Sequence, residues 1–296
     1  MNRTSIAVFF ALALPIARAP GADPVNVNRL PADLVVPVAE EGEAAPGRRV
    51  FAATPGWEGT AVRHVTYLPR DWRPGSSLPV LVEYPGNGGY RNDHGDVSDG
   101  TPEGCTLGYG LSAGEGFVWV CLPFVALSPD GGREVCREWW GDLGETKRYC
   151  TATVQDVCRR FGGDASRVVL CGFSRGAIAC NHVGLHDDAI AALWRGFFCH
   201  SHYDGVRSWP YAGSDRAAAV ARLRRLGRRP QWISHELDVG PTRDFVEGSG
   251  VAGEFEFTAI PYPNHTAGWV LRDIPERARA REWLRRTVDG PAPRER

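Results

Sequence analysis

Short apolar runs alternate with helix-like segments along most of the chain. Residues 80–84, 117–123 and 167–172 are mostly apolar runs of strand length. The other strand-like runs are residues 61–68, 193–200, 231–235 and 254–260, and the helix-like segments are residues 146–160, 177–185, 214–226, 242–247 and 275–288. Strands that alternate with helices predict a mostly parallel central sheet with helices on both faces, which is an α/β fold.

The beginning of the chain does not follow this pattern. Residues 2–3 include a basic residue, an apolar run covers residues 6–16, and Ala-Arg-Ala follows, which is typical of a secretory signal peptide. The apolar run is shorter than the ~20 residues that span a bilayer, so we expect no stable membrane anchor. We expect residues 1–22 to be a signal peptide and the protein to be secreted or periplasmic. Residues 23–59, rich in Pro, Ala, Glu and Gly, predict a linker or loosely ordered leader before one domain over 60–290.

Composition narrows the possibilities further. A chain of 296 residues can bury one large core, and its net charge of −1 provides no general attraction for nucleic acid. Export to an oxidising compartment would permit disulfides among the eight cysteines. The cysteines form no C-x-x-C pair, so the sequence does not indicate a zinc ribbon or a thioredoxin site. Cys105, Cys136, Cys150 and Cys158 lie in loop-like sequence or at a helix start and are the better disulfide candidates. Cys121, Cys171 and Cys199 lie in strand-like runs, which favours buried thiols.

The strand-like run at 167–172 leads into Gly172-Phe-Ser174-Arg-Gly176 and then into a segment of small residues. A G-x-S-x-G sequence between a strand and a helix is a nucleophile elbow, in which a strained turn exposes the serine hydroxyl above the sheet. The two glycines are required because the strand and helix backbones pass close together there. The sequence therefore predicts that Ser174 is a nucleophile.

A serine nucleophile needs a base and a group that orients the base, and both follow later strands. Asp238 comes after the strand-like run at 231–235, and His265 comes after the last one, which gives the order Ser, Asp, His. The ends of parallel strands meet at one edge of a sheet, so these three side chains can converge. We expect His265 to act as the base and Asp238 as the acid. The alternative acids are Asp244 and Asp204.

His200 and His202 are the strongest competitors of His265. They end a strand-like run close to Asp204, where they could form a small metal cluster or a polar lining of a cleft. We expect neither a metal nor another cofactor, because acyl transfer by a serine requires none.

Acyl transfer passes through an oxyanion, which is stabilised by backbone N–H groups. One donor is expected to be the amide of Arg175, which directly follows the nucleophile. The second is expected at Asn87 or Gly88, in the glycine-rich turn after the strand at 80–84. Trp139 and Trp140 form a pair that could bind substrate.

Together, the elbow, the turn Pro-Gly-Asn-Gly-Gly at 85–89, Asp238 and His265 resemble the α/β-hydrolase superfamily. Within it, secreted esterases similar to polyhydroxybutyrate depolymerases and to acetylxylan or feruloyl esterases come closest, over residues 60–288. The resemblance implies an α/β-hydrolase fold and a serine hydrolase that cleaves carboxylic esters through an acyl-enzyme. Export and the tryptophan pair favour small-molecule or polysaccharide-linked esters as substrates. The turn departs from the H-G-G-G pattern, and residues 90–116 and the tryptophan pair match no pattern.

Two alternatives remain open. One is a serine peptidase or acyltransferase on the same fold, and the other is a non-catalytic binding module on a hydrolase scaffold. The resemblance also implies that the strand at 80–84 lies between the strands of Cys121 and Cys171. With strands ~4.8 Å apart, these two cysteines would lie beyond the ~7 Å Cα separation that a disulfide spans, so they should not be bridged.

Overall fold

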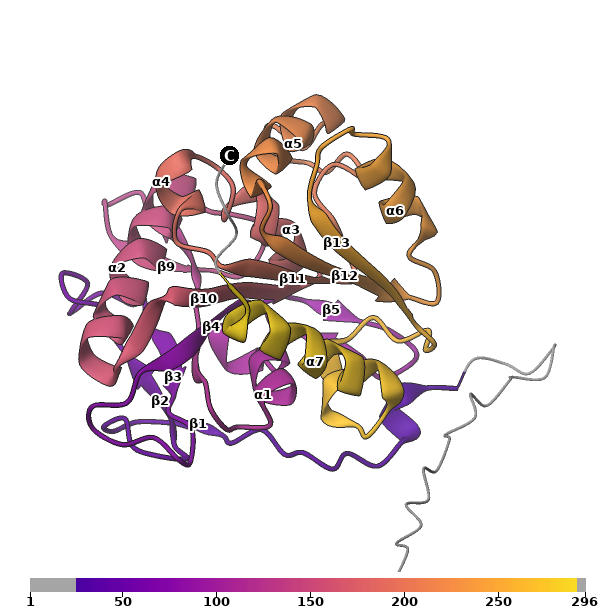
Figure 1. The fold of residues 1–296 in the computed structure, drawn as a ribbon. Helices are drawn as coiled ribbons and strands as arrows, with labels where there is room; N and C mark the ends of the chain where they lie inside the picture. Colours follow the sequence, from indigo (N-terminus) through magenta and orange to yellow (C-terminus); the bar gives the residue numbers. More distant parts are fainter. Residues whose placement is uncertain (1–24, 292–296) are drawn as a thin grey trace, which may run out of the picture.

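The computed structural model describes residues 25–291, which form a nine-stranded sheet with helices on both faces (Figure 1). In spatial order the strands are β1 (Ala39–Glu40), β2 (Arg49–Ala52), β3 (His64–Tyr67), β7 (Val118–Cys121), β4 (Leu78–Tyr84), β10 (Gly163–Phe173), β11 (Gly196–His200), β12 (Pro230–Glu236) and β13 (Glu254–Ile260). The six strands from β7 to β13 run parallel, while β3 pairs antiparallel with both β2 and β7. The expected α/β class is confirmed.

The helices divide between the two faces of the sheet. They are α1 (Leu107–Ser112), α2 (Leu143–Phe161), α3 (Arg175–His182), α4 (Asp188–Ala191), α5 (Arg216–Leu223), α6 (Gly240–Glu247) and α7 (Pro275–Asp289). The core on one face contains buried side chains of α2 to α6, and the core on the other contains those of α1 and α7. Strand β4 serves both, because Val80 and Val82 point into the first core and Leu81 into the second. A strand buried on both faces reads as a continuous apolar run.

Shorter elements fill the segments without a clear sequence pattern. The hairpins are β5 (Tyr90–Arg91) with β6 (Val97–Ser98) and β8 (Phe124–Leu127) with β9 (Arg133–Cys136). The 3-10 helices are η1 (Val27–Arg29), η2 (Pro102–Gly104), η3 (Arg224–Leu226) and η4 (Ala267–Leu271). Residues 90–116 therefore contain β5, β6, η2 and α1. None of the helices within residues 25–291 is long and apolar enough to cross a membrane.

Residues 25–59 belong to the fold, so the expectation of a loosely ordered leader is wrong for them. Strands β1 and β2 extend the central sheet, and Val27 is fully buried. Arg49 on β2 is buried as well, and its guanidinium donates hydrogen bonds to the carbonyls of Pro102 and Glu103. Strands this short leave little periodic pattern in the sequence. The expected signal peptide at 1–22 lies outside the described residues.

The strand order predicted for the two strand cysteines is confirmed. Glu83 on β4 is the register partner of Cys121 on one side and of Cys171 on the other, so β4 separates them. The disulfide expectation is not confirmed, because all eight cysteines are free thiols. Cys105 and Cys150, two of the favoured candidates, lie in the cores on opposite faces of the sheet and cannot pair.

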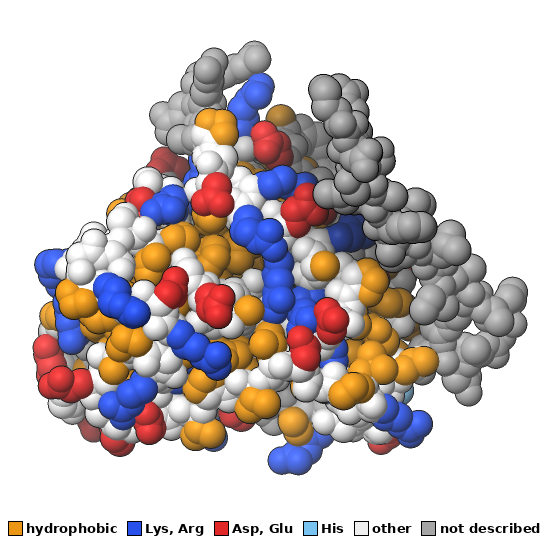
Figure 2. Space-filling model, turned by 60° about the horizontal axis from the view of Figure 1, so that its bottom comes forward, with side chains coloured by type: hydrophobic (Ala, Val, Ile, Leu, Met, Phe, Trp, Pro, Cys, Tyr) orange, Lys and Arg blue, Asp and Glu red, His pale blue; other side chains and the backbone are white. Residues whose placement is uncertain are grey.

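The surface carries charges of both signs. On the face shown in Figure 2, acidic and basic side chains are interspersed with polar and apolar ones, and the described side chains form no large area of a single sign. This agrees with a net charge close to zero.

Candidate active site

The strand, turn and helix expected around Ser174 are present. Ser174 lies between β10 and α3 with φ 53° and ψ −115°, a backbone conformation that non-glycine residues seldom adopt. A Cβ atom on Gly172 would lie 2.2 Å from the backbone of Gly176, and one on Gly176 would lie 2.0 Å from the carbonyl oxygen of Tyr84. The two glycines therefore permit the close approach of strand and helix that holds Ser174 in its strained turn.

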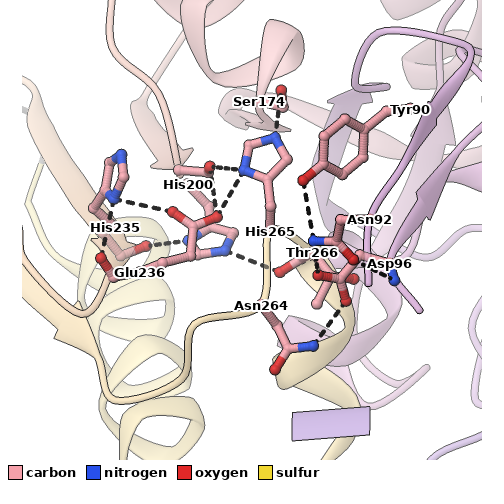
Figure 3. A network of polar contacts seen from close by, with 12 residues as sticks. Tyr90, Asn92, Asp96, Ser174, His200, His235, Glu236, Asn264, His265 and Thr266 are labelled. Atoms are coloured by element: carbon pink, nitrogen blue, oxygen red, sulfur yellow. Dashed lines mark hydrogen bonds and ion pairs between the residues drawn. The ribbon is translucent and has the colours of Figure 1, made fainter. Parts of the chain in front are cut away.

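His265 lies beside Ser174 although 91 residues separate them in the sequence (Figure 3). Its Nε2 atom is 3.1 Å from Ser174 Oγ, and its Nδ1 atom is 2.9 Å from Oε1 of Glu236. With Nδ1 protonated toward the carboxylate, Nε2 is free to accept the serine proton. The contacts form a continuous chain from hydroxyl to imidazole to carboxylate.

The carboxylate in contact with His265 belongs to Glu236 and not to Asp238, so the expectation for Asp238 is wrong. Glu236 is the last residue of β12, and the chain turns away at Leu237, where φ is 58°. Asp238 is exposed, and its Oδ1 accepts a hydrogen bond of 2.7 Å from the Gly240 amide at the start of α6. Asp238 therefore stabilises the turn that leads into α6.

Neither alternative acid replaces Glu236. Asp244 lies within α6, and Asp204 forms a buried ion pair of 2.8 Å with Arg222 on α5. Burial alone would raise the pKa of Glu236, but hydrogen bonds from His235 and His265 lower it well below its usual value. The carboxylate is therefore ionised at neutral pH, as a partner of an imidazolium must be.

Ser201 is a third neighbour of His265 and Glu236. Its hydroxyl donates to Oε1 of Glu236 at 2.7 Å and lies 2.7 Å from His265 Nδ1. Ser201 is fully buried and has φ 85°, a second strained residue within the site. Nothing in the sequence marked it beyond its place one residue after β11.

The other two histidines considered as the base, His200 and His202, do not contact Ser174 Oγ in place of His265. His200 Nδ1 lies 3.0 Å from Ser234 Oγ and its Nε2 lies 3.0 Å from the Thr266 carbonyl. Burial lowers the pKa of His200 to about 4 and that of His202 to about 3, so both are neutral. With Asp204 paired to Arg222, these residues do not converge on a common point as metal ligands would.

One buried group within residues 25–291 does bring metal-type ligand atoms together: Glu83, Cys105 and Cys121. The Glu83 carboxylate already accepts hydrogen bonds from the indole of Trp119 and from the amides that begin α1, the last of them Gly108 at 2.8 Å. Arg49 also donates to Cys121 Sγ at 3.6 Å. These contacts give the group a structural role at the start of α1.

The turn after β4 leaves one of its two expected oxyanion donors available. The Gly88 amide donates to the Arg137 carbonyl at 2.7 Å, so the expectation for Gly88 is wrong. The amides of Asn87 and Arg175 have no acceptor within the described part of the chain. The side chain of Asn87 accepts a hydrogen bond of 2.9 Å from the Trp139 amide, which fixes the turn against the tryptophan loop.

The two tryptophans have different environments. Trp140 is buried and stacks on His182 of α3 with ring centroids 4.6 Å apart, so it belongs to the core and not to a substrate surface. Trp139 is half-buried, and its ring lies 5.5 Å from that of Trp209. The side chain of Arg175 holds this loop through a hydrogen bond of 2.8 Å to the Trp139 carbonyl, a role that the elbow motif did not indicate.

A buried carboxylate that does not contact Ser174, His265 or Glu236 supports the loop that carries His265. Asp96, between β5 and β6, is 2% exposed and accepts hydrogen bonds of 2.8 Å from the side-chain amides of Asn28, Asn92 and Asn264 (Figure 3). Asn264 directly precedes His265. The loop of His265 is therefore attached both to the N-terminal segment and to the β5–β6 hairpin.

Comparisons with known proteins agree with this fold. No family model and no curated protein matches the chain in sequence. Among solved structures it is similar to an S-formylglutathione hydrolase from Agrobacterium tumefaciens (TM-score 0.56, 15% identity, covering 86% of this chain and 99% of that one). It is also similar to a fungal esterase from Rhizomucor miehei (TM-score 0.53, 14% identity, 83% and 85%).

Other similar structures belong to longer proteins. The AtxE2 isopeptidase matches with a TM-score of 0.52 and 16% identity over 84% of this chain, which spans only 41% of the isopeptidase. A thermostable esterase matches with a TM-score of 0.50 and 16% identity. The match covers 80% of this chain and 61% of the esterase. At these identities the likeness establishes the α/β-hydrolase fold.

Proposed function

We propose that this protein is a serine hydrolase that cleaves carboxylic esters through an acyl-enzyme. Ser174 is the nucleophile, His265 the general base and Glu236 the acid that orients it. The observation that carries the proposal is the chain of contacts from Ser174 Oγ through His265 to Glu236, built on a strained elbow. Strained serines with such partners are a feature of active sites.

The geometry supports a two-step reaction. His265 Nε2 takes the Ser174 proton as Oγ attacks the ester carbonyl, and the imidazolium is stabilised by the Glu236 carboxylate. The amides of Arg175 and Asn87 are the proposed donors to the oxyanion, and loss of one such donor costs ~3 kcal/mol. His265 then protonates the leaving alcohol, and a water molecule activated by the same imidazole releases the acid.

The substrate class and the location of the protein are also part of the proposal. Small-molecule or polysaccharide-linked esters are supported by the half-buried Trp139 near the oxyanion turn, since indole rings pack on sugar and acyl groups. Export is supported by the charged, apolar and small-residue pattern of residues 1–22. A serine peptidase on the same fold is the second candidate, because the isopeptidase is among the similar structures.

Ester hydrolysis by the full chain tests the proposal. Wild type should hydrolyse p-nitrophenyl acetate, and Ser174→Ala should reduce kcat by about 10³-fold or more. Ser166→Ala is the matched control, since Ser166 lies near the other end of β10 and contacts only Asp164. A fluorophosphonate should label Ser174 in wild type only. Equal rates of ester hydrolysis in wild type and Ser174→Ala would rule out the proposed serine hydrolase. Faster cleavage of peptides than of esters would favour the peptidase.

A further inference from the structure

Two histidines share the carboxylate of Glu236. His265 Nδ1 lies 2.9 Å from Oε1, and His235 Nδ1 lies 3.0 Å from Oε2 and 3.2 Å from the backbone carbonyl of Glu236, so each imidazole lies against a different carboxylate oxygen (Figure 3). His235 precedes Glu236 on β12, whereas the imidazole that contacts Ser174 Oγ is that of His265. The catalytic chain of contacts therefore has a branch at its acid.

His235 is not a core residue. Its side chain is 28% exposed, whereas that of Glu236 is 9% exposed. The backbone pairs with Ala259 on β13, which brings no charge to the histidine. The titratable and charged groups around its imidazole are Glu236, His200, His202, Arg207 and His265. Glu236 is the only anion in this set, so it is the group through which His235 can act.

We propose that His235 is a positioning residue that sets the strength of His265 as a base by sharing the carboxylate of Glu236. The proposal rests on the proposed function, since it takes His265 as the base. A carboxylate stabilises an imidazolium by its negative charge, and a second cation on the other oxygen opposes that stabilisation. With His235 protonated, His265 is a weaker base, and with His235 neutral, Glu236 supports His265 alone.

The direction of the pH effect follows from the environment of His235. Burial lowers the pKa of His235, but its contacts with Glu236 outweigh this and leave it above the usual 6.5. His235 therefore holds its proton more strongly than an ordinary histidine and loses it at a higher pH. The pH profile of kcat/KM should therefore contain, beside its main rise, a second and partial rise as His235 loses its proton.

An NMR titration of imidazole-¹⁵N-labelled full-length protein tests the coupling without any need for activity. The His235 signals should titrate above pH 6.5 in wild type, and Glu236→Gln should shift their midpoint down by about one unit or more. His186→Asn is the control, because His186 lies away from Glu236 and should leave the His235 midpoint unchanged. A His235 midpoint that is the same in wild type and Glu236→Gln would overturn the proposal.

Kinetics of His235→Asn test the consequence for catalysis. The asparagine amide can replace the Nδ1–H donor but cannot be protonated, so kcat/KM should rise with pH in one step. KM should stay unchanged because the proposed effect of His235 passes through Glu236. A two-step profile in His235→Asn would contradict the proposal. If His235→Asn unfolds below the assay temperature, His235→Gln replaces it in the same kinetic test. Loss of the proposed function itself would show as hydrolysis that does not depend on Ser174, whatever the NMR titration gives.

Discussion

The amide of Val27 donates a hydrogen bond of 2.7 Å to Oδ1 of Asn264, across 237 residues of sequence. Asn264 is the neighbour of His265, so the beginning of the described chain contacts the loop of the proposed base. The Nδ2 atom of Asn264 donates to Asp96 and to Asn26 at 2.8 and 2.9 Å. Both N–H groups and the oxygen of this side-chain amide therefore have partners, which fixes the loop of His265 from two directions.

Asp96→Asn should weaken this attachment. The three amides around Asp96 all donate to it, and one oxygen replaced by an NH₂ group would face a donor. We expect a loss of ~1–3 kcal/mol in the free energy of unfolding and a lower kcat for ester hydrolysis. Asp93→Asn, an exposed position in the same hairpin, is the control for chemical denaturation and kinetics. Unchanged stability and kcat in Asp96→Asn would show that the network does not support His265.

Glu236 and Asp238 can be compared directly, because Glu236 is the proposed acid and Asp238 stabilises the turn before α6. Glu236→Gln should lower kcat by about 10³-fold or more, since the amide cannot stabilise an imidazolium. Asp238→Asn should leave kcat within about twofold and lower the free energy of unfolding by at most ~1 kcal/mol. Steady-state kinetics and urea denaturation of the two variants give the answer, and the reverse order of effects would restore Asp238 as the acid.

Predictability from sequence differs between the fold and the site. Apolar runs predict the strands, and the two glycines of G-x-S-x-G predict the elbow. Any Cβ atom added at these glycines would collide with backbone, so both predictions depend on local chemistry. The prediction of Asp238 as the acid is wrong because the turn at Leu237 decides which carboxylate reaches His265. No pattern of polar residues in the sequence indicates that turn. The leader was misjudged because its attachment uses side-chain contacts such as the ion pair of Asp33 with Arg277, 244 residues away. Contacts at that separation are not encoded in local pattern.

The hydroxyl of Ser201 should contribute to the rate of ester hydrolysis. Its O–H donates to Glu236 beside the His265 Nδ1 contact, so Ser201→Ala should lower kcat by about tenfold, equivalent to ~1.4 kcal/mol of transition-state stabilisation, with little change in KM. Ser201→Gly also lacks the hydroxyl but tolerates φ 85°, so it should be as slow as Ser201→Ala and more stable to heat. If Ser201→Gly were as fast as wild type, the backbone strain and not the hydroxyl would be what matters.

The stability of the fold should depend on pH through His64. His64 is buried on β3, its Nδ1 accepts a hydrogen bond of 2.8 Å from the Tyr149 hydroxyl, and burial lowers its pKa to about 3. In the unfolded chain the imidazole titrates near 6.5, so below that pH the unfolded state binds a proton that the folded state does not. The free energy of unfolding should therefore fall from pH 6.5 downward, by ~2 kcal/mol at pH 5 from this residue alone. His64→Asn keeps an acceptor for Tyr149 and should flatten that slope in urea titrations, while His94→Asn, at an exposed position, should not. The same slope in wild type and His64→Asn would mean that His64 is not held neutral by the fold.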